Sequence, residues 1–334
     1  MIYYFIANLT ELEPEKEILL LDNLTLKTVP PELLLELKSL IKRYYPENRS
    51  TLFNILINDF YNSFHEYKKV KDLPSGSIHI VPRKHDDFRY FVLQDNDKKF
   101  KQIYSKAFAL SDKDFFIPFS FVFNTNTAIK TSFNHLCIYT YYNDLNTNDK
   151  YLLNKKVRIK APNNFTDFDK VQIVEYIKLI EKFEKIESDF PYICKALNDF
   201  FHTFELSDYS VFKIVSYIAC LELLLVDGNP DRLKSISSQL QVKLNLLNNQ
   251  FESPIDINDY IKGPDTLTLG KVIETIYTYR SLVAHGDFID FSKKLNILEK
   301  IDSEDILNFI RVVLKKVIIY SLKNPTLIRD LKKC

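Results

Sequence analysis

Arg280 and His285 are the residues of this sequence whose types and spacing could do chemistry on a phosphate. They lie in the stretch YTYRSLVAHG, residues 277–286, which otherwise reads as the buried end of a helix. A histidine exchanges a proton near neutral pH, and the planar fork of an arginine holds a phosphate. This pair suits metal-free cleavage of RNA by the ribose 2′-hydroxyl, with His285 as general base or acid and Arg280 offsetting charge at phosphorus. The products would be a cyclic phosphate and a free 5′-hydroxyl.

The spacing of the two residues limits how they could meet. Five residues of a regular α-helix turn the chain by about 500°, so the two side chains would point about 140° apart. Gly286 could accept a left-handed cap and let His285 swing off the helix axis. Alternatively, a second copy of the helix, related by a two-fold axis, would bring two arginines and two histidines together.

The segment around this stretch, residues 205–290, resembles the HEPN domain (higher eukaryotes and prokaryotes nucleotide-binding), in particular its Apea-like branch known from anti-phage proteins. YRSLVAHG matches the RxxxxH signature followed by glycine. The preceding stretches YSVFKIVSYIACLELLL and DRLKSISSQLQVKLNLL are similar in order and spacing to the helices before that signature.

The resemblance implies an α-helical bundle that forms a homodimer, with the RxxxxH residues of both subunits lining one cleft and cutting RNA without a metal. Arg280 and His285 carry over directly as catalytic residues. Glu222 lies where family members often bear an acidic residue, so it is a candidate for orienting Arg280; an ordinary exposed or capped helix carboxylate is the alternative. Ser281 departs from the Asn, Asp or His that many active members place after the arginine, although a serine can still hydrogen-bond a phosphate or His285.

Three functions follow as expectations. The first is a metal-independent endoribonuclease, a hydrolase-type toxin acting in prokaryotic anti-phage defence or abortive infection. The second is a non-catalytic HEPN module whose cleft binds a nucleotide or a partner protein, an alternative that Ser281 favours. The third is a scaffold subunit in which Arg280 only makes an intersubunit ion pair.

The C-terminal part of the chain reads as helical throughout, and its predicted helices include the one that carries the signature. They are predicted at residues 206–227, with Ser207 as cap and a stop at Gly228; 230–247, with Pro230 in the first turn; 268–286; and 303–325.

The N-terminal part has a different pattern. Two helices are predicted within residues 31–64, and short aromatic or β-branched runs predict a small sheet within residues 76–160. The runs are SIHIVP, FRYFVLQ, FFIPFSFVF, HLCIYTYY and KVRIK. The expected fold class is therefore α+β, with a mixed α/β domain over residues 1–162 and an all-α bundle over 163–334. The first domain is given a sensing or substrate-guiding role, with a possible regulatory partner protein.

Composition excludes several classes of function. The 45 basic and 44 acidic residues nearly cancel, so no global field attracts a polyanion. The five glycines form neither a GxGxxG nor a GxxxxGK phosphate cradle, and no cofactor is expected. Four widely spaced cysteines suit reduced thiols, and the start of the chain lacks signal-peptide character, so we expect a cytoplasmic protein with no membrane partner.

Two further groups of residues in the N-terminal part have types that could form a site. Strand alternation does not bring His79 and His85 together, so no metal site is predicted there with Asp86 and Asp87. Aromatic residues interleave with basic ones and could guide RNA, although such aromatic residues more often form a core. The basic residues are Arg83, Lys84, Arg89, Lys98, Lys99, Lys101 and Lys106, and the aromatic ones are Phe88, Tyr90, Phe91 and Tyr104.

Overall fold

The fold is seen in a computed structural model, which describes part of the chain. The described residues are 2–6, 9–12, 17–28, 67–71, 78–82, 91–97, 101–115, 117, 119–122, 131–133, 138–139, 157–158, 163–206, 211–227, 235–261, 268–285 and 303–334. The chain divides into two compact units, Met1–Ile177 and Lys178–Cys334. The division falls inside a helix, whereas the sequence places the boundary between residues 162 and 163.

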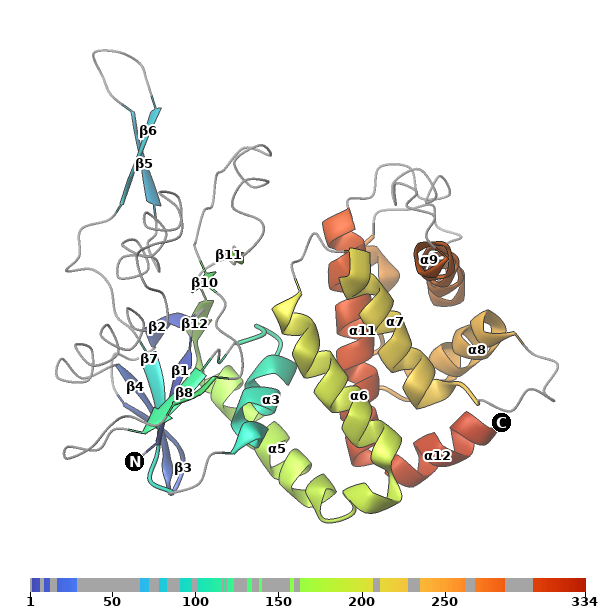
Figure 1. The fold of residues 1–334 in the computed structure, drawn as a ribbon, viewed down its shortest axis with the longest axis horizontal. Coiled ribbons are helices and arrows are strands. Elements are labelled where there is room, and N and C mark those ends of the chain that lie inside the picture. Colours follow the sequence, from blue (N-terminus) through green and yellow to red (C-terminus); the bar gives the residue numbers. More distant parts are fainter. Residues whose placement is uncertain are drawn as a thin grey trace. The chain divides into compact units, whose positions relative to one another are not determined.

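The first unit is built on an antiparallel six-stranded sheet of order β3-β4-β7-β1-β8-β9 (Figure 1). Its strands are β1 (Ile2–Ile6), β3 (Ile18–Leu21), β4 (Leu24–Thr28), β7 (Phe91–Asp95), β8 (Phe119–Val122) and β9 (Thr131–Phe133). In β4, buried Leu24 and Leu26 alternate with more exposed residues, as expected of a strand with one face in a core.

Three smaller strand pairs complete the described strands of this unit. β5 (Tyr67–Lys71) and β6 (Ile78–Pro82) are antiparallel. The other two pairs are parallel: β2 (Leu9–Leu12) with β12 (Asn163–Phe165), and β10 (Ile138–Tyr139) with β11 (Val157–Arg158).

Helix α3 (Gln102–Leu110) packs onto the sheet through aromatic contacts. The rings of Tyr4 on β1 and Tyr104 on α3 meet edge to face, with centroids 5.3 Å apart. The Tyr4 hydroxyl accepts a 2.9 Å hydrogen bond from the Lys101 backbone N–H just before the helix. Burial raises the pKa of Tyr104 to about 12, which keeps its hydroxyl protonated within this core.

The second unit contains only helices among its described residues, joined to the first through α5 (Asp167–Glu184). Its α-helices are α6 (Pro191–His202), α7 (Val211–Leu225), α8 (Ile236–Asn248), α9 (Leu269–Ala284), α11 (Ser303–Lys323) and α12 (Pro325–Lys333). Single 3-10 turns are η2 (Glu187–Asp189), η3 (Thr203–Glu205) and η4 (Ile257–Asp259).

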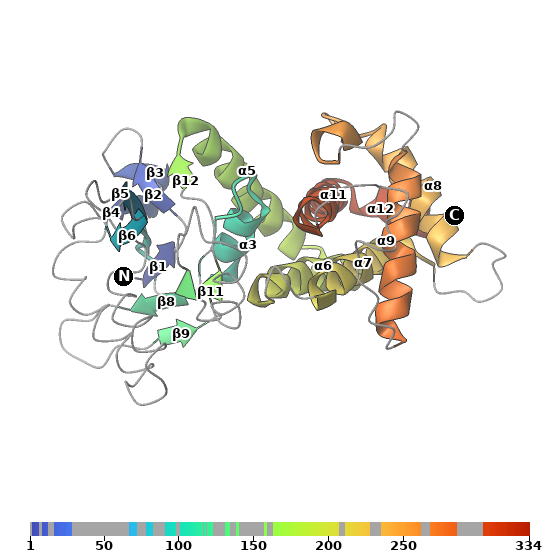
Figure 2. The same cartoon turned by 90° about the horizontal axis from the view of Figure 1, so that it is seen from above.

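Helix α7 lies at the centre of this unit and contacts α6, α8, α9, α11 and α12. Figures 1 and 2 show α9 running across the direction of α7, while α6 and α11 lie beside α7. Buried apolar residues of α7, including Ile218 and Leu221, face this core, and so do Ile310 and Val317 of α11. These five helices therefore pack around α7 in one hydrophobic core.

The fold class predicted from sequence is confirmed: a small antiparallel sheet near the N-terminus precedes a mainly helical remainder. Five of the structure's strands coincide with predicted runs: β6, β8, β10 and β11 lie within them, and β7 extends one residue beyond its run. The sequence reading missed that β1, β3 and β4 supply half of the main sheet, and that α3 interrupts the strand region. The predicted helices of residues 31–64 lie outside the described residues.

One predicted helix start is wrong. Helix α8 begins after Ser235, whose hydroxyl accepts the Ser238 backbone N–H at 3.2 Å, so Pro230 is not in its first turn. The Ser235 hydroxyl gives a partner to a backbone N–H that has none within the helix, whereas a proline in the first turn would only remove such an N–H. The serine therefore determines where the helix starts. Ser207 and Gly228, the predicted ends of the preceding helix, lie outside the described residues.

Candidate functional site

Glu222 of α7 and Arg280 of α9 each lie at the edge of a buried helix face. Leu221 and Tyr279, the residues that precede them, are 0% and 3% exposed. The side chains of Glu222 and Arg280 keep 19% and 27% of their exposure. Packing of the two apolar faces therefore brings two charged side chains together at the rim of the core, where both remain accessible to solvent.

The approach of α9 to this position is set at the start of the helix. Thr268 caps its start by accepting the Lys271 backbone N–H at 3.3 Å. At Gly270 the helix comes close to α8, where an added Cβ would lie 3.2 Å from Asn245 Nδ2. A Cβ at this point would require the Asn245 side chain to shift by a few tenths of an ångström, so glycine suits the observed packing of α9 against α8.

The two charged groups are in direct contact. Arg280 Nη2 donates to Glu222 Oε2 at 3.2 Å, and the guanidinium also lies over the Tyr277 ring, 5.8 Å from its centroid. Tyr277 precedes Arg280 by three residues, the spacing that puts two side chains on one helix face. The sequence allowed Glu222 to be an unrelated surface carboxylate; in the structure it is the partner of Arg280.

Hydrogen-bonding capacity is left over on both partners. Glu222 Oε1 and Arg280 Nε are buried and have no hydrogen-bond partner among the described residues. An unsatisfied buried donor and acceptor are costly, and such pairs are expected where a ligand or water completes the site. Arg280 therefore retains a donor that its contact with Glu222 does not use.

The surroundings of the pair favour the neutral form of the Glu222 carboxyl more than water does. Burial raises the pKa of Glu222, and the Arg280 charge acts in the opposite direction. Burial likewise raises the pKa of Tyr277, with the Glu222 carboxylate adding to the rise and Arg280 opposing it. The three side chains thus form one electrostatic unit, which we call the Arg280 cluster: Glu222, Tyr277 and Arg280.

His285 lies at the end of the same helix and is exposed. Its backbone N–H bonds to the carbonyl oxygens of Ser281 and Leu282, both at 3.1 Å, so it continues the last turn of α9. The helix is unbroken from Arg280 to Ala284, and a regular helix directs residues 280 and 285 about 140° apart. The predicted left-handed cap at Gly286 lies outside the described residues. Within one chain, then, the structure brings Glu222 to Arg280 and leaves His285 on another side of the helix.

Nothing compared with this chain matches it. This holds for the family models, for the curated proteins and for the solved structures. The case for a function therefore depends on the residues themselves.

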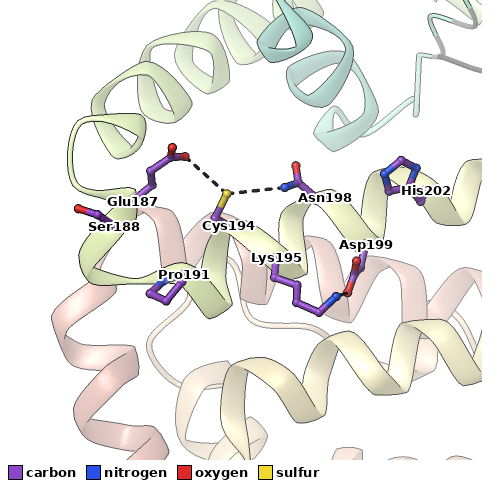
Figure 3. A pocket seen from close by; sticks show the side chains of 8 residues that line it. All are labelled: Glu187, Ser188, Pro191, Cys194, Lys195, Asn198, Asp199 and His202. Carbon is purple, nitrogen blue, oxygen red and sulfur yellow. Dashed lines mark hydrogen bonds and ion pairs between the residues drawn. The ribbon is translucent and has the colours of Figure 1, made fainter. Parts of the chain in front are cut away.

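A pocket of about 470 Å³ lies elsewhere in the second unit, along one face of α6 (Figure 3). It is lined by Glu187, Ser188, Pro191, Cys194, Lys195, Asn198, Asp199 and His202. Its polar groups bond mainly to one another: Cys194 Sγ lies 3.5 Å from Glu187 Oε2, and Lys195 pairs with Asp199 at 2.9 Å. Eight residues separate Cys194 from His202, a rise of about 12 Å, so they do not form a nucleophile and base pair. Sequence reasoning did not predict this pocket, because its residues form the ordinary polar face of an amphipathic helix.

The other sequence candidates are only partly described. His79 lies on β6 opposite Val70, whereas His85, Asp86 and Asp87 lie outside the described residues. In the described part of the chain, no three His, Cys, Asp or Glu residues are grouped so as to hold a metal ion. The same part contains no helix that is both long and apolar enough to cross a bilayer.

The basic and aromatic run of the first unit uses its described aromatic residues in the core. Phe91 and Tyr104 are each 1% exposed, so neither ring is available to stack on a base. Lys101 lies over the Tyr104 ring and pairs with Asp97. Lys106 is partly exposed, and the remaining residues of the run lie outside the described residues.

Proposed function

We propose that this chain is a metal-independent endoribonuclease of the HEPN type. The observation that carries the proposal is the contact between Arg280 and Glu222, which places the arginine of the RxxxxH motif on an acidic partner from a neighbouring core helix. The resemblance of residues 205–290 to Apea-like members leads to the same pairing. Glu222 acts here as a positioning residue, because it holds the guanidinium through a charge-assisted hydrogen bond.

The reaction is transfer of a phosphoester bond within the RNA chain. His285 takes the proton of a ribose 2′-hydroxyl, and the resulting oxygen attacks the adjacent phosphorus. The bond to the 5′-oxygen breaks, and that oxygen takes a proton from water, while His285 returns its own proton to solvent. Arg280 offsets the charge that builds on the phosphoryl oxygens, and Ser281 donates a hydrogen bond to the phosphate.

The homodimer is part of the proposal, because one unbroken α9 directs Arg280 and His285 to different sides. A two-fold axis beside α9 would place the arginine of one copy near the histidine of the other. In this arrangement the protein is a cytoplasmic effector of anti-phage defence, a toxin of the abortive-infection kind. The first unit would sense the trigger or guide the substrate, and a regulatory partner protein could act there.

The test uses purified full-length protein and a mixed single-stranded RNA in the presence of a chelator. Wild-type protein should cleave the RNA and leave cyclic phosphate and 5′-hydroxyl ends. Arg280→Ala and His285→Ala should each lower the cleavage rate by about a hundred-fold or more. Lys178→Ala, at an exposed position of α5, is the matched control and should cleave normally. Cleavage that survives both active-site changes would end the proposal.

A second candidate is a non-catalytic HEPN module that binds a nucleotide or a partner protein at the Arg280 cluster. It is favoured by the engagement of Arg280 with Glu222 inside one chain, which leaves only part of the guanidinium for a ligand. Tight RNA or nucleotide binding without turnover, unchanged by His285→Ala, would select this function over the enzyme.

A further inference from the structure

The sequence placed two tyrosines beside Arg280, and the structure separates their roles. Tyr279 is 3% exposed and belongs to the core. Tyr277 is partly exposed and carries the Arg280 guanidinium over its ring, 5.8 Å from the centroid. A tyrosine at the rim of a core, next to a charged site, presents an apolar ring face to whatever enters that site.

We propose that Tyr277 is a nucleobase-binding residue, stacking on the base of a nucleotide whose phosphate is held by Arg280. The inference rests on the proposed function and adds the contact that positions the RNA strand. A nucleotide offers a flat base and an anionic phosphate close together, and the Arg280 cluster offers an aromatic ring with a cation 5.8 Å from the ring centroid. Neither group of the cluster alone would discriminate a nucleotide from another anion.

The arrangement also explains why the ring is held by Arg280 rather than left free. A guanidinium over the ring restricts its rotamers, so less conformational entropy is lost when a base stacks. Glu222 fixes the guanidinium in turn, through the 3.2 Å contact between Nη2 and Oε2. The three side chains form a preordered platform in which the carboxylate orients the cation and the cation orients the ring. Because every base has a π face, this platform binds RNA with little base preference.

The test measures RNA binding by full-length protein carrying His285→Ala, which removes the proposed proton-transfer residue and keeps the oligonucleotide intact. The probe is a fluorescent single-stranded oligoribonucleotide, compared with a version that has abasic sites. Tyr277→Leu in this background should raise Kd about ten-fold, and Tyr277→Phe should stay within about two-fold of the parent. Abasic RNA should bind the parent about ten-fold more weakly and lose nothing further with Tyr277→Leu.

Tyr192→Leu is the matched control, because Tyr192 also lies under a cation, Lys332, at 4.8 Å, but on α6. It should leave Kd unchanged. Equal binding of intact RNA by the parent and Tyr277→Leu overturns base stacking by Tyr277 but does not affect the proposed ribonuclease function. Absence of RNA binding by the parent overturns both base stacking and the proposed ribonuclease function. If Tyr277→Leu does not fold, the Phe variant and the abasic RNA still decide the matter, because equal binding of intact and abasic RNA by the parent excludes stacking.

Discussion

The side chain of Lys243 on α8 donates a 2.9 Å hydrogen bond to the backbone oxygen of Lys332 on α12. It also donates to the Leu225 oxygen at 2.9 Å, at the end of α7. Lys332 itself donates to the Leu223 oxygen, and burial lowers its pKa. Two lysines thus satisfy carbonyl groups that the ends of α7 and α12 leave without helical partners. The C-terminal turn of α7, which carries Glu222, is tied in this way to two other helices.

Lys243→Ala should lower the free energy of unfolding by about 2–4 kcal/mol. Lys243 is 4% exposed, and removing its ammonium group leaves buried carbonyl oxygens unsatisfied as well as an empty space. Urea unfolding of the full chain measures the change, with Lys178→Ala as an exposed lysine control that should stay within about 0.5 kcal/mol. Equal stability of the two variants would show that the carbonyls find other donors.

Glu222→Gln should separate stability from activity. Burial raises the pKa of Glu222, so the folded state holds this proton more tightly than the unfolded chain. The free energy of unfolding of wild-type protein must then fall, relative to Glu222→Gln, as pH rises from the ordinary carboxyl pKa through the raised one. Above that interval the Gln variant should be equally stable or slightly more stable, although it no longer pairs a charge with Arg280.

The measurement for this variant is urea unfolding of both proteins at several pH values between about 4 and 7, together with RNA cleavage at neutral pH. Cleavage by Glu222→Gln should drop about ten-fold, because the neutral amide holds the guanidinium less firmly. A stability difference that grows in favour of wild-type protein as pH rises would contradict the prediction, since the sign of the pKa shift would then be opposite.

Mixing two inactive variants should restore cleavage if the site is shared between protomers. Arg280→Ala and His285→Ala, mixed in equal amounts and allowed to exchange, give half mixed dimers, each with one intact Arg280 and His285 pair across the two-fold axis. About a quarter of wild-type activity is expected. Each variant mixed with itself is the control. If native mass measurement shows mixed dimers but cleavage does not recover, both residues of a working site lie in one chain.

Local chemistry determined much of the helical unit from the sequence alone. Apolar residues at helical spacing predicted α7, α9 and α11, because an amphipathic helix must bury that face whatever it packs against. Short runs rich in aromatic and β-branched residues predicted β6, β7 and β8, because a strand turns every second side chain toward the same face of its sheet. The predicted start of α8 was wrong because it was based on Pro230 alone. The helix is capped five residues later, where the Ser235 hydroxyl accepts a hydrogen bond from a backbone N–H of the first turn.

Only the tertiary structure decided which distant residues meet. The sheet joins strands β3 and β4 to β7 across a long stretch of chain, and such pairing depends on register between segments, which no local pattern encodes. In the same way, the sequence left two alternatives open for Glu222, and it did not determine whether Tyr277 or Tyr279 packs in the core. The packing of α9 across α7 made both choices, because helix crossing, rather than sequence spacing, determines which side chains at the rim of a core come into contact.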